Sequence, residues 1–297
     1  MPSHRRNSAE WVGILFSLPW IIGFAVFIAY PILASLYFSF CSYDAIRPPH
    51  WVGWRNYVEL FTQDDVFWKS LSNTLYMIVF GLPLMLASSL GLAMLLNQKV
   101  KGIALYRTLF YLPSITPVVA SSILWMWILN PDIGLINIVL SRFGVAHPPG
   151  WLTDPAWAKP ALILMSLWSA GGGMVIYLAA LQDVPDTLYE AASLDGAGAW
   201  HKFLHVTLPM ISPVILFNVI IGLIGFFQYF TQAYIMTNGG PEDSTNFYAL
   251  HLFNRAFLDF QMGAASAMAW ILFLVTLLAA LVVFKTSARW VYYAGEK

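Results

Sequence analysis

Residues 190–209 read EAASLDGAGAWHKFLHVTLP, and they lie between two long apolar runs at 160–181 and 209–235. The stretch combines four alanines and two glycines with five ionisable side chains, which are Glu190, Asp195, His201, Lys202 and His205. A run of about 20 apolar residues is long enough to cross a bilayer as a helix. The stretch is therefore interpreted as a polar connection between two membrane spans.

The composition of the whole chain is typical of a membrane protein. Of 297 residues, 59% are apolar and 10% are charged, whereas a soluble domain has about 45–50% apolar and about 25% charged residues. Apolar runs predict helices at 11–39, 71–97, 106–129, 160–181, 209–235 and 262–284. The first run is longer than the ~7–15 residue core of a signal peptide, so we interpret it as a span. The sequence predicts an all-α polytopic membrane protein with six transmembrane helices.

The distribution of positive charge predicts the orientation, because Lys and Arg are in excess on the cytoplasmic side. With six spans the two termini share a side, and that side carries nine of these residues: Arg5, Arg6, Lys99, Lys101, Arg107, Lys202, Lys285, Arg289 and Lys297. The opposite side carries six: Arg47, Arg55, Lys69, Arg142, Lys159 and Arg255. Both termini are therefore expected in the cytoplasm, together with the connection 183–208.

This topology predicts the organisation of the chain. We expect a cytoplasmic N-terminal tail (1–10), the first helix with an extracytoplasmic loop (11–70), a five-helix core (71–285) and a cytoplasmic C-terminal tail (286–297).

The residues that several classes of membrane protein require are absent from the sequence. The central parts of the expected spans contain no Asp, Glu, Lys, Arg or His, which disfavours a proton-coupled transporter or a voltage sensor. No G-x-x-x-x-G-K-[ST] motif occurs, so the chain has no P-loop for ATP. The net charge of zero argues against nucleic acid as a partner. Energy for uphill transport would have to come from another subunit.

Enzyme and metal chemistry also find little support. His201 and His205 are four residues apart and would share a helix face, but no third ligand is nearby, so we expect no metal site and interpret them as a solvated or interface pair. Cys41 is the only cysteine, and no G-x-S-x-G motif is present. We therefore expect no catalytic residues.

The opening stretch resembles the cytoplasmic signature of permease subunits of binding-protein-dependent ABC importers. That signature reads EAA, three residues, G, nine residues and I-x-LP. Here Glu190, Ala191 and Ala192 are followed after three residues by Gly196, and after nine more by Val206, Thr207, Leu208 and Pro209. Only Val206, in place of Ile, departs from it. Leu95–Asn97, YLPSITPVVAS, TNGGPEDST and Met262–Ala267 resemble the carbohydrate-uptake branch of maltose, lactose and glycerol-3-phosphate permeases.

The resemblance implies the type I ABC importer permease fold in the cytoplasmic membrane of a bacterium or archaeon. It implies a second homologous permease, two ATPase subunits that hold ATP and Mg, and an extracytoplasmic solute-binding protein as partners, with membrane lipid around the spans and no cofactor on this chain. In this family the loop carrying the signature, here the coupling loop 183–208, docks into a cleft on the ATPase. That role carries over to Glu190, Ala191, Ala192, Asp195, Gly196, Leu208 and Pro209.

The local sequence predicts how the coupling loop folds. Pro185 and Asp186 favour a helix start in which the Asp186 side chain caps backbone donors. A short helix at 187–193, a turn at Asp195–Gly196 and a second helix at 197–205 should follow, and Pro209 should open the fifth span. The alternative is a simple turn between spans, but 26 residues exceed the ~2–8 of most helix connections.

Polar and aromatic residues in three spans are candidates for a sugar path, because aromatic faces and amide or hydroxyl groups bind neutral sugars. The resemblance to the maltose permease places these regions around its sugar site. The candidates are Ser114, after an expected break at Pro113, with Ser166, Trp168, Ser169, Phe226, Gln228, Tyr229 and Gln232. The alternative is that they only join helices to one another. Gly171–Gly173 is read as a helix crossing, a break or a substrate contact.

Other functions stay open on sequence alone. A permease for glycerol-3-phosphate, an amino acid or another small solute would share the docking signature. A secondary transporter or a membrane receptor would match the composition but would have no use for that signature. The sequence favours an importer permease for a sugar or related polyol.

Overall fold

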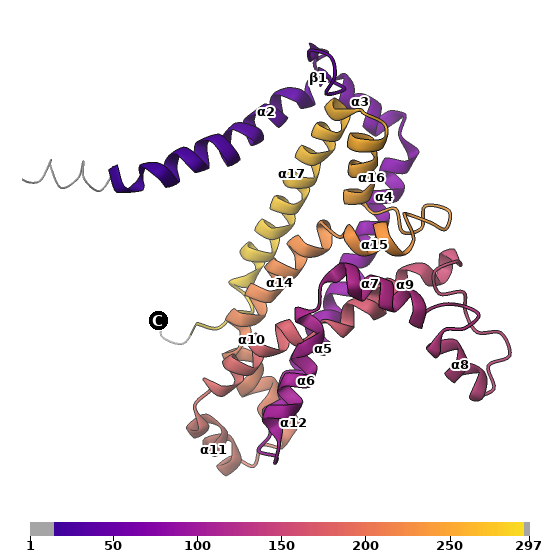
Figure 1. Cartoon of the computed structure of the whole chain (residues 1–297). Coiled ribbons are helices and arrows are strands. Elements are labelled where there is room, and N and C mark those ends of the chain that lie inside the picture. Colours follow the sequence, from indigo (N-terminus) through magenta and orange to yellow (C-terminus); the bar gives the residue numbers. More distant parts are fainter. Residues whose placement is uncertain (1–14, 294–297) are drawn as a thin grey trace, which may run out of the picture. The chain divides into compact units, whose positions relative to one another are not determined.

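The computed structural model describes residues 15–293, in which nearly all regular structure is helical (Figure 1). Four helical stretches are long and apolar enough to cross a membrane: Leu15–Ser39, Asp65–Leu96, Ser212–Met236 and Met262–Ser287. Two bent pairs supply the other spans: Ile103–Ile115 with Val118–Ile128, and Pro155–Trp168 with Gly171–Gln182. With each bent pair counted as one span, the six-span prediction is confirmed; residues 11–14 of the first lie outside the described part.

The elements of the chain divide between two compact units. The first unit comprises the residues up to Gln63 together with Leu252–Ile271. It contains η1 (Ala25–Ala29), α2 (Tyr30–Ser39), β1 (Cys41–Ser42), β2 (His50–Trp51), α3 (Arg55–Thr62), η4 (Asn254–Leu258) and the start of α17 (Met262–Ser287). β1 and β2 form an antiparallel hairpin that pairs Cys41 with Trp51.

The second unit, Asp64–His251 with the residues from Leu272 onward, holds the remaining elements. Its first half contains α4 (Asp65–Tyr76), η2 (Met77–Gly81), α5 (Leu82–Leu96), α6 (Ile103–Ile115), α7 (Val118–Ile128), α8 (Leu135–Arg142), α9 (Pro155–Trp168) and α10 (Gly171–Gln182). Its second half contains α11 (Asp186–Leu194), α12 (Ala199–Lys202), η3 (Phe203–Thr207), α13 (Leu208–Met210), α14 (Ser212–Phe227) and α15 (Thr231–Met236). α16 (Tyr248–Phe253) lies at the boundary of the two units.

The second unit is organised around α5, which packs against α6, α10 and α14, while α15 packs against α7. Buried apolar side chains form two clusters. One surrounds Leu162, Phe226 and Phe247, and the other surrounds Ala93, Tyr177 and Ile211. The second cluster joins α5, α10 and the start of the fifth span, so the ends of three spans share one core.

The second span begins at Asp65, six residues before the predicted start. The Asp64 carboxylate caps α4 by accepting from the Phe67 amide at 2.9 Å. The polar residues Ser70, Asn73 and Thr74 are buried and hydrogen-bonded, so they continue the helix instead of delaying it. The predicted start at residue 71 was wrong because the polar residues before and after it were taken as part of the loop, whereas they belong to the helix.

Candidate functional site

The coupling loop folds as two short helical segments joined by a tight turn. α11 ends at Leu194, and the amide of Ala197 donates to the carbonyl of Ala192 at 2.9 Å. The amide of Gly196 donates to the Ser193 carbonyl at 3.1 Å, and Gly196 has a φ of +79°. These bonds are those of a Schellman motif, in which the left-handed position favours glycine. The signature glycine is therefore the residue that reverses the chain.

Hydrogen bonds hold the two segments of the coupling loop together. The Tyr189 and Thr207 hydroxyls lie 2.9 Å apart, and Lys202 Nζ donates to Ser193 Oγ at 2.6 Å. At its base, Val184, Tyr189 and Val206 join the apolar cluster that contains Tyr177 and Ile211. The coupling loop is consequently packed against the adjoining ends of the second, fourth and fifth spans.

The surface of the coupling loop exposes large apolar side chains and carboxylates. Leu194 is 90% exposed and Trp200 is 70% exposed. Glu190 and Asp195 are exposed, and within the described residues neither carboxylate has a hydrogen-bond or ion-pair partner. Ala191 is exposed and Ala192 half-buried, and Ala192, Asp195, Gly196 and His201 line a shallow hollow. Exposed apolar side chains beside free carboxylates are typical of a surface that meets another protein.

Three details of the predicted loop need correction. Asp186 is the first residue of α11, and its side chain caps nothing, because Pro185 takes the capping position without a side-chain bond. The second helix begins at Ala199, not Ala197, since Gly198 is extended. Pro209 lies within α13, where a proline near a helix start is tolerated, and the fifth span begins at Ser212 after a turn at Ile211.

His201 and His205 stack with their ring centroids 4.0 Å apart. His205 Nδ1 lies 3.1 Å from the His201 carbonyl. Across residues 15–293 no group of three or more His, Cys, Asp or Glu side chains is arranged to hold a metal ion.

The third span is broken, and the break corrects the role given to Pro113. Pro113 lies inside α6, while the chain bends by 98° between Ile115 and Val118. Thr116 is extended with ψ of 131°, as expected for a residue that precedes a proline, here Pro117. Ser114 lies on the last turn of α6 and donates to the Tyr111 carbonyl at 2.7 Å.

The fourth span bends by 49° between Trp168 and Gly171. Ser166 and Ser169 donate to backbone carbonyls three residues earlier, at 2.7 and 2.8 Å. Trp168 packs edge-on against Trp125 with a centroid distance of 6.0 Å. A side chain at Gly171 would place its Cβ 2.1 Å from the Phe110 carbonyl oxygen, so α10 begins in backbone contact with α6. The glycine run is both a break and a close crossing.

The fifth span is interrupted between Phe227 and Thr231. Gln228 is exposed and Gln232 is half-buried, and neither side-chain amide has a partner within residues 15–293. Phe226 and Tyr229 are instead buried, with their rings 6.2 Å apart, and Tyr229 meets Phe247 edge-on. All eight path candidates therefore lie near a helix break, but these two aromatics face the core of the chain.

Sequence reasoning missed one residue at these breaks. Ser89, in α5, donates its hydroxyl to the Ala170 carbonyl at 3.0 Å, the carbonyl at the bend of the fourth span. A Cβ at Gly173 would lie 2.8 Å from Ser89 Oγ. Adjacent serines at 88 and 89 within an apolar run were the available signal, because polar groups at membrane depth need a partner in the protein.

A second motif-bearing segment, Thr237–Phe247, exposes Asn238, Glu242 and Asp243 but buries all of its last four residues, Ser244–Phe247; we call it the buried loop. Asn73 Nδ2 donates to the carbonyls of Asp243 at 2.7 Å and Asn246 at 3.2 Å. Lys159 Nζ donates to Asn73 Oδ1 at 3.0 Å. The Thr237 and Thr245 hydroxyls lie 2.6 Å apart, so this segment is bonded within its own chain.

Comparison with known proteins identifies the family. A probable ABC transporter permease, YesP of Bacillus subtilis (strain 168), is 45% identical over 96% of this chain and 93% of its own. The lactose transport system permease LacF of Rhizobium radiobacter is 40% identical over 82% of this chain and 83% of its own. The crystal structure of a bacterial ABC transporter that imports the acidic polysaccharide alginate matches 96% of this chain and 98% of its own, with a TM-score of 0.83 and 26% identity.

The family model described as binding-protein-dependent transport system inner membrane component matches residues 83–292. This range contains the coupling loop, the three broken spans and the buried loop. The fold is that of an ABC importer permease. The chain belongs to the family of inner membrane components of binding-protein-dependent transport systems.

Proposed function

We propose that the chain is one of two homologous permease subunits of an importer for a sugar or related polyol. The observation that carries the proposal is the coupling loop: a braced, exposed knob whose Glu190 carboxylate has no partner in the described chain and whose Leu194 is 90% exposed. Such a surface fits a cleft on another subunit. The sugar-uptake permeases among its relatives support the solute class.

ATP, with Mg, binds to two separate ATPase subunits, and this chain binds no cofactor. The sequence supports this division, since it contains no P-loop. Closure of the ATPase pair moves the coupling loop, and the shared core around Tyr177 and Ile211 passes that movement to the second, fourth and fifth spans. The permease then alternates between inward-open and outward-open states, each favoured by a different ligand.

The test of coupling is Glu190→Lys in the assembled importer, with Asp132→Lys as the matched control. Both acids are exposed, and Asp132 lies on the opposite side of the expected topology. Glu190→Lys should leave folding and permease pairing unchanged while abolishing ATPase co-purification and ATP-dependent uptake. Asp132→Lys should retain both. Normal co-purification and uptake by Glu190→Lys would refute docking through this loop.

The solute path is assigned to the exposed or half-buried candidates at the three breaks, which are Ser114, Ser166, Trp168, Ser169, Gln228 and Gln232. Phe226 and Tyr229 are buried and support the residues of the solute path from within the core. Interrupted helices at membrane depth are tolerated where they are buried in protein or line a water-filled cavity. The unpartnered Gln228 amide supports the assignment, because a free amide at that depth needs water, solute or protein.

Gln228→Ala tests the path. Loss of one hydrogen bond of about 1 kcal/mol would raise the KM for uptake about fivefold, whereas Gln98→Ala, an exposed glutamine outside the spans, should leave it unchanged. An unchanged KM and unchanged solute selectivity in Gln228→Ala would remove this residue from the path.

The orientation we propose places both termini and the coupling loop in the cytoplasm, with the solute-binding protein on the other face. The organisation follows as a tail at 1–10, the first helix and outer loop at 11–70, the core at 71–285 and a tail at 286–297. The bias of nine positive residues against six supports it. A Ser193→Cys variant should react with an impermeant maleimide only after the cytoplasmic face is opened; labelling in intact cells would reverse the topology.

A further inference from the structure

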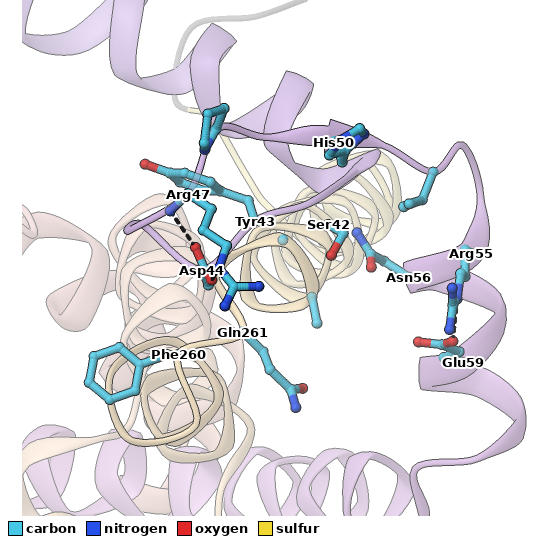
Figure 2. Close-up of a pocket in the computed structure, with 14 residues that line it drawn as sticks. Ser42, Tyr43, Asp44, Arg47, His50, Arg55, Asn56, Glu59, Phe260 and Gln261 are labelled. Carbon is cyan, nitrogen blue, oxygen red and sulfur yellow. Dashed lines mark hydrogen bonds and ion pairs between the residues drawn. The ribbon is translucent and has the colours of Figure 1, made fainter.

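The first compact unit contains a half-open pocket of about 450 Å3, which we call the outer pocket (Figure 2). The β1–β2 hairpin and its loop form one wall, and α3 forms a second. The third wall is the turn before α17 and the first residues of that helix, with Phe260, Gln261, Gly263 and Ala264. Of the six spans only α17 contributes to the pocket, through its first residues, and none of the proposed path residues lines it.

The walls of the outer pocket are fixed to one another. Asn56, which is buried on α3, donates its amide to the carbonyls of Ser39 and Cys41 at 2.8 and 2.9 Å. The Gly263 amide donates to the Tyr43 carbonyl at 3.1 Å. A Cβ at Gly263 would lie 2.0 Å from the Cys41 carbonyl oxygen, so only glycine permits this approach of α17 to the hairpin. The shape of the outer pocket is therefore fixed by hydrogen bonds and close backbone packing within the first unit.

The charged residues of the outer pocket are paired with one another. The Asp44 carboxylate accepts from the amides of Arg47 and Ile46 at 2.8 and 3.0 Å, and the Arg47 amide contributes most to holding the pKa of Asp44 below its usual value. Arg47 Nε lies 3.8 Å from Asp44, and Arg55 Nε donates to Glu59 at 2.7 Å. The two acids and two arginines balance in charge, and His50 is the one imidazole in the lining.

The remaining groups suit a ligand rich in hydroxyls. The Phe260 ring is 56% exposed at the edge of the outer pocket, and the Tyr43 ring stacks on Phe38. The side-chain oxygen Oε1 of Gln261 accepts from Arg255 Nη1 at 2.8 Å, which leaves the side-chain amide hydrogens of Gln261 available. The hydroxyls of Tyr43 and Ser42 have no hydrogen-bond partner among residues 15–293. Hydroxyl groups both donate and accept, and aromatic faces cover the apolar faces of sugar rings.

We propose that the outer pocket binds a neutral saccharide, as a second site separate from the translocation path. Its volume lies within the ~300–1,000 Å3 of small-molecule sites. Paired charges disfavour anions and cations, while free hydroxyl and amide groups beside an exposed ring favour a neutral polyhydroxylated ring. The inference shares the solute class of the proposed function, but it does not depend on the coupling loop or on the path residues.

A thiol reporter tests the site in the assembled importer in nanodiscs without binding protein. Cys41, the only native cysteine, is fully buried, so Ser42→Cys supplies the reactive thiol of this chain. Lactose, galactose and glucose are the probes. At least one should slow maleimide labelling of Ser42→Cys, about tenfold at ten times its Kd. Phe260→Ala in the same background should remove most of this protection.

The control reporter is Ser141→Cys, exposed on α8 and outside the outer pocket. Its labelling rate should not change with any sugar. The proposal fails if none of the three sugars protects Ser42→Cys, or if Ser141→Cys is protected equally. In a parallel sample with added binding protein, protection by that protein but by none of the sugars would reassign the pocket to a protein contact. Uptake by the importer with the unmodified chain is measured separately, so absence of ATP-dependent import there would count against the proposed function and not against the pocket.

Discussion

The coupling loop and the buried loop are both polar, glycine-containing connections with a family-like sequence, yet their polar groups have opposite fates. In the coupling loop Glu190 is exposed and has no partner in the part of the chain that the structure describes, and Leu194 and Trp200 are largely exposed. In the buried loop Ser244, Thr245 and Asn246 are buried, and the backbone carbonyls of Asp243 and Asn246 accept from Asn73. Within the described residues Ser244 Oγ and Asn246 Oδ1 have no hydrogen-bond partner. The backbone of the buried loop is therefore bonded within the chain, whereas the coupling loop leaves charged and apolar side chains exposed.

A motif can be required for the stability of its own chain or for contact with a partner, and the sequence alone does not distinguish the two roles. The difference in burial between the two loops does distinguish them. A buried segment whose backbone is bonded internally serves the stability of its own chain, because leaving those backbone groups without a partner would cost free energy. A segment that leaves apolar and charged groups exposed serves a partner. Substitutions in the two loops should therefore affect different measurements.

The largest effect on stability should come from Asp64→Ala, next to the buried loop. Asp64 Oδ2 lies 2.9 Å from His251 Nε2, with both side chains buried, and the other oxygen caps α4. Losing the bond to His251 and the cap should lower the free energy of unfolding by about 3 kcal/mol. Thermal unfolding of the purified subunit in detergent measures this change.

Asp65→Ala is the matched control for that variant, since Asp65 is the exposed neighbour. It should shift the free energy of unfolding by no more than about 0.5 kcal/mol. Equal effects of the two variants would mean that the His251 contact contributes nothing.

A smaller loss is expected from Asn73→Ala. Two carbonyls of the buried loop and Lys159 lose their partner, at a cost of about 2 kcal/mol. The same unfolding measurement applies, with the exposed Ser72→Ala as its control. If Asn73→Ala unfolds at the wild-type temperature, the buried loop is not held by these bonds.

The smallest change in stability should follow from Leu194→Ala with Trp200→Ala in the coupling loop. Both side chains are more than two thirds exposed, so the free energy of unfolding should move by no more than about 0.5 kcal/mol. Affinity for the ATPase should fall about 30-fold if the pair forms a binding hot spot of about 2 kcal/mol. An unchanged ATPase affinity in a titration would place the contact elsewhere on the loop.

The number of spans and the turn at Gly196 could be predicted because hydrophobic length and a left-handed glycine are local properties. The break in the third span was placed at Pro113 and lies at Thr116–Pro117, since the effect of a proline on a helix depends on which neighbours receive the freed backbone groups. The bond from Ser89 to Ala170 joins residues 81 apart in the chain, so the local sequence can indicate that Ser89 needs a partner but not which residue supplies it.

Which of the path candidates are buried could not be predicted from the local sequence either. Phe226 and Gln228 are two residues apart at the same break, yet one enters the core around Phe247 and the other is exposed. The backbone is not helical at Gln228 and Phe230. The ~3.6-residue repeat of a helix therefore cannot predict which side chains of this segment point into the core.

The bonds that close the coupling loop on itself also make it a transplantable part. Its turn is completed by Ala192, Gly196 and Ala197, and its two segments are fastened by Tyr189 with Thr207. Only the apolar base, with Val184 and Val206, must be matched to a new host. If the proposed function holds, permeases that differ in solute can exchange this segment, and with it their choice of ATPase, without changing their spans.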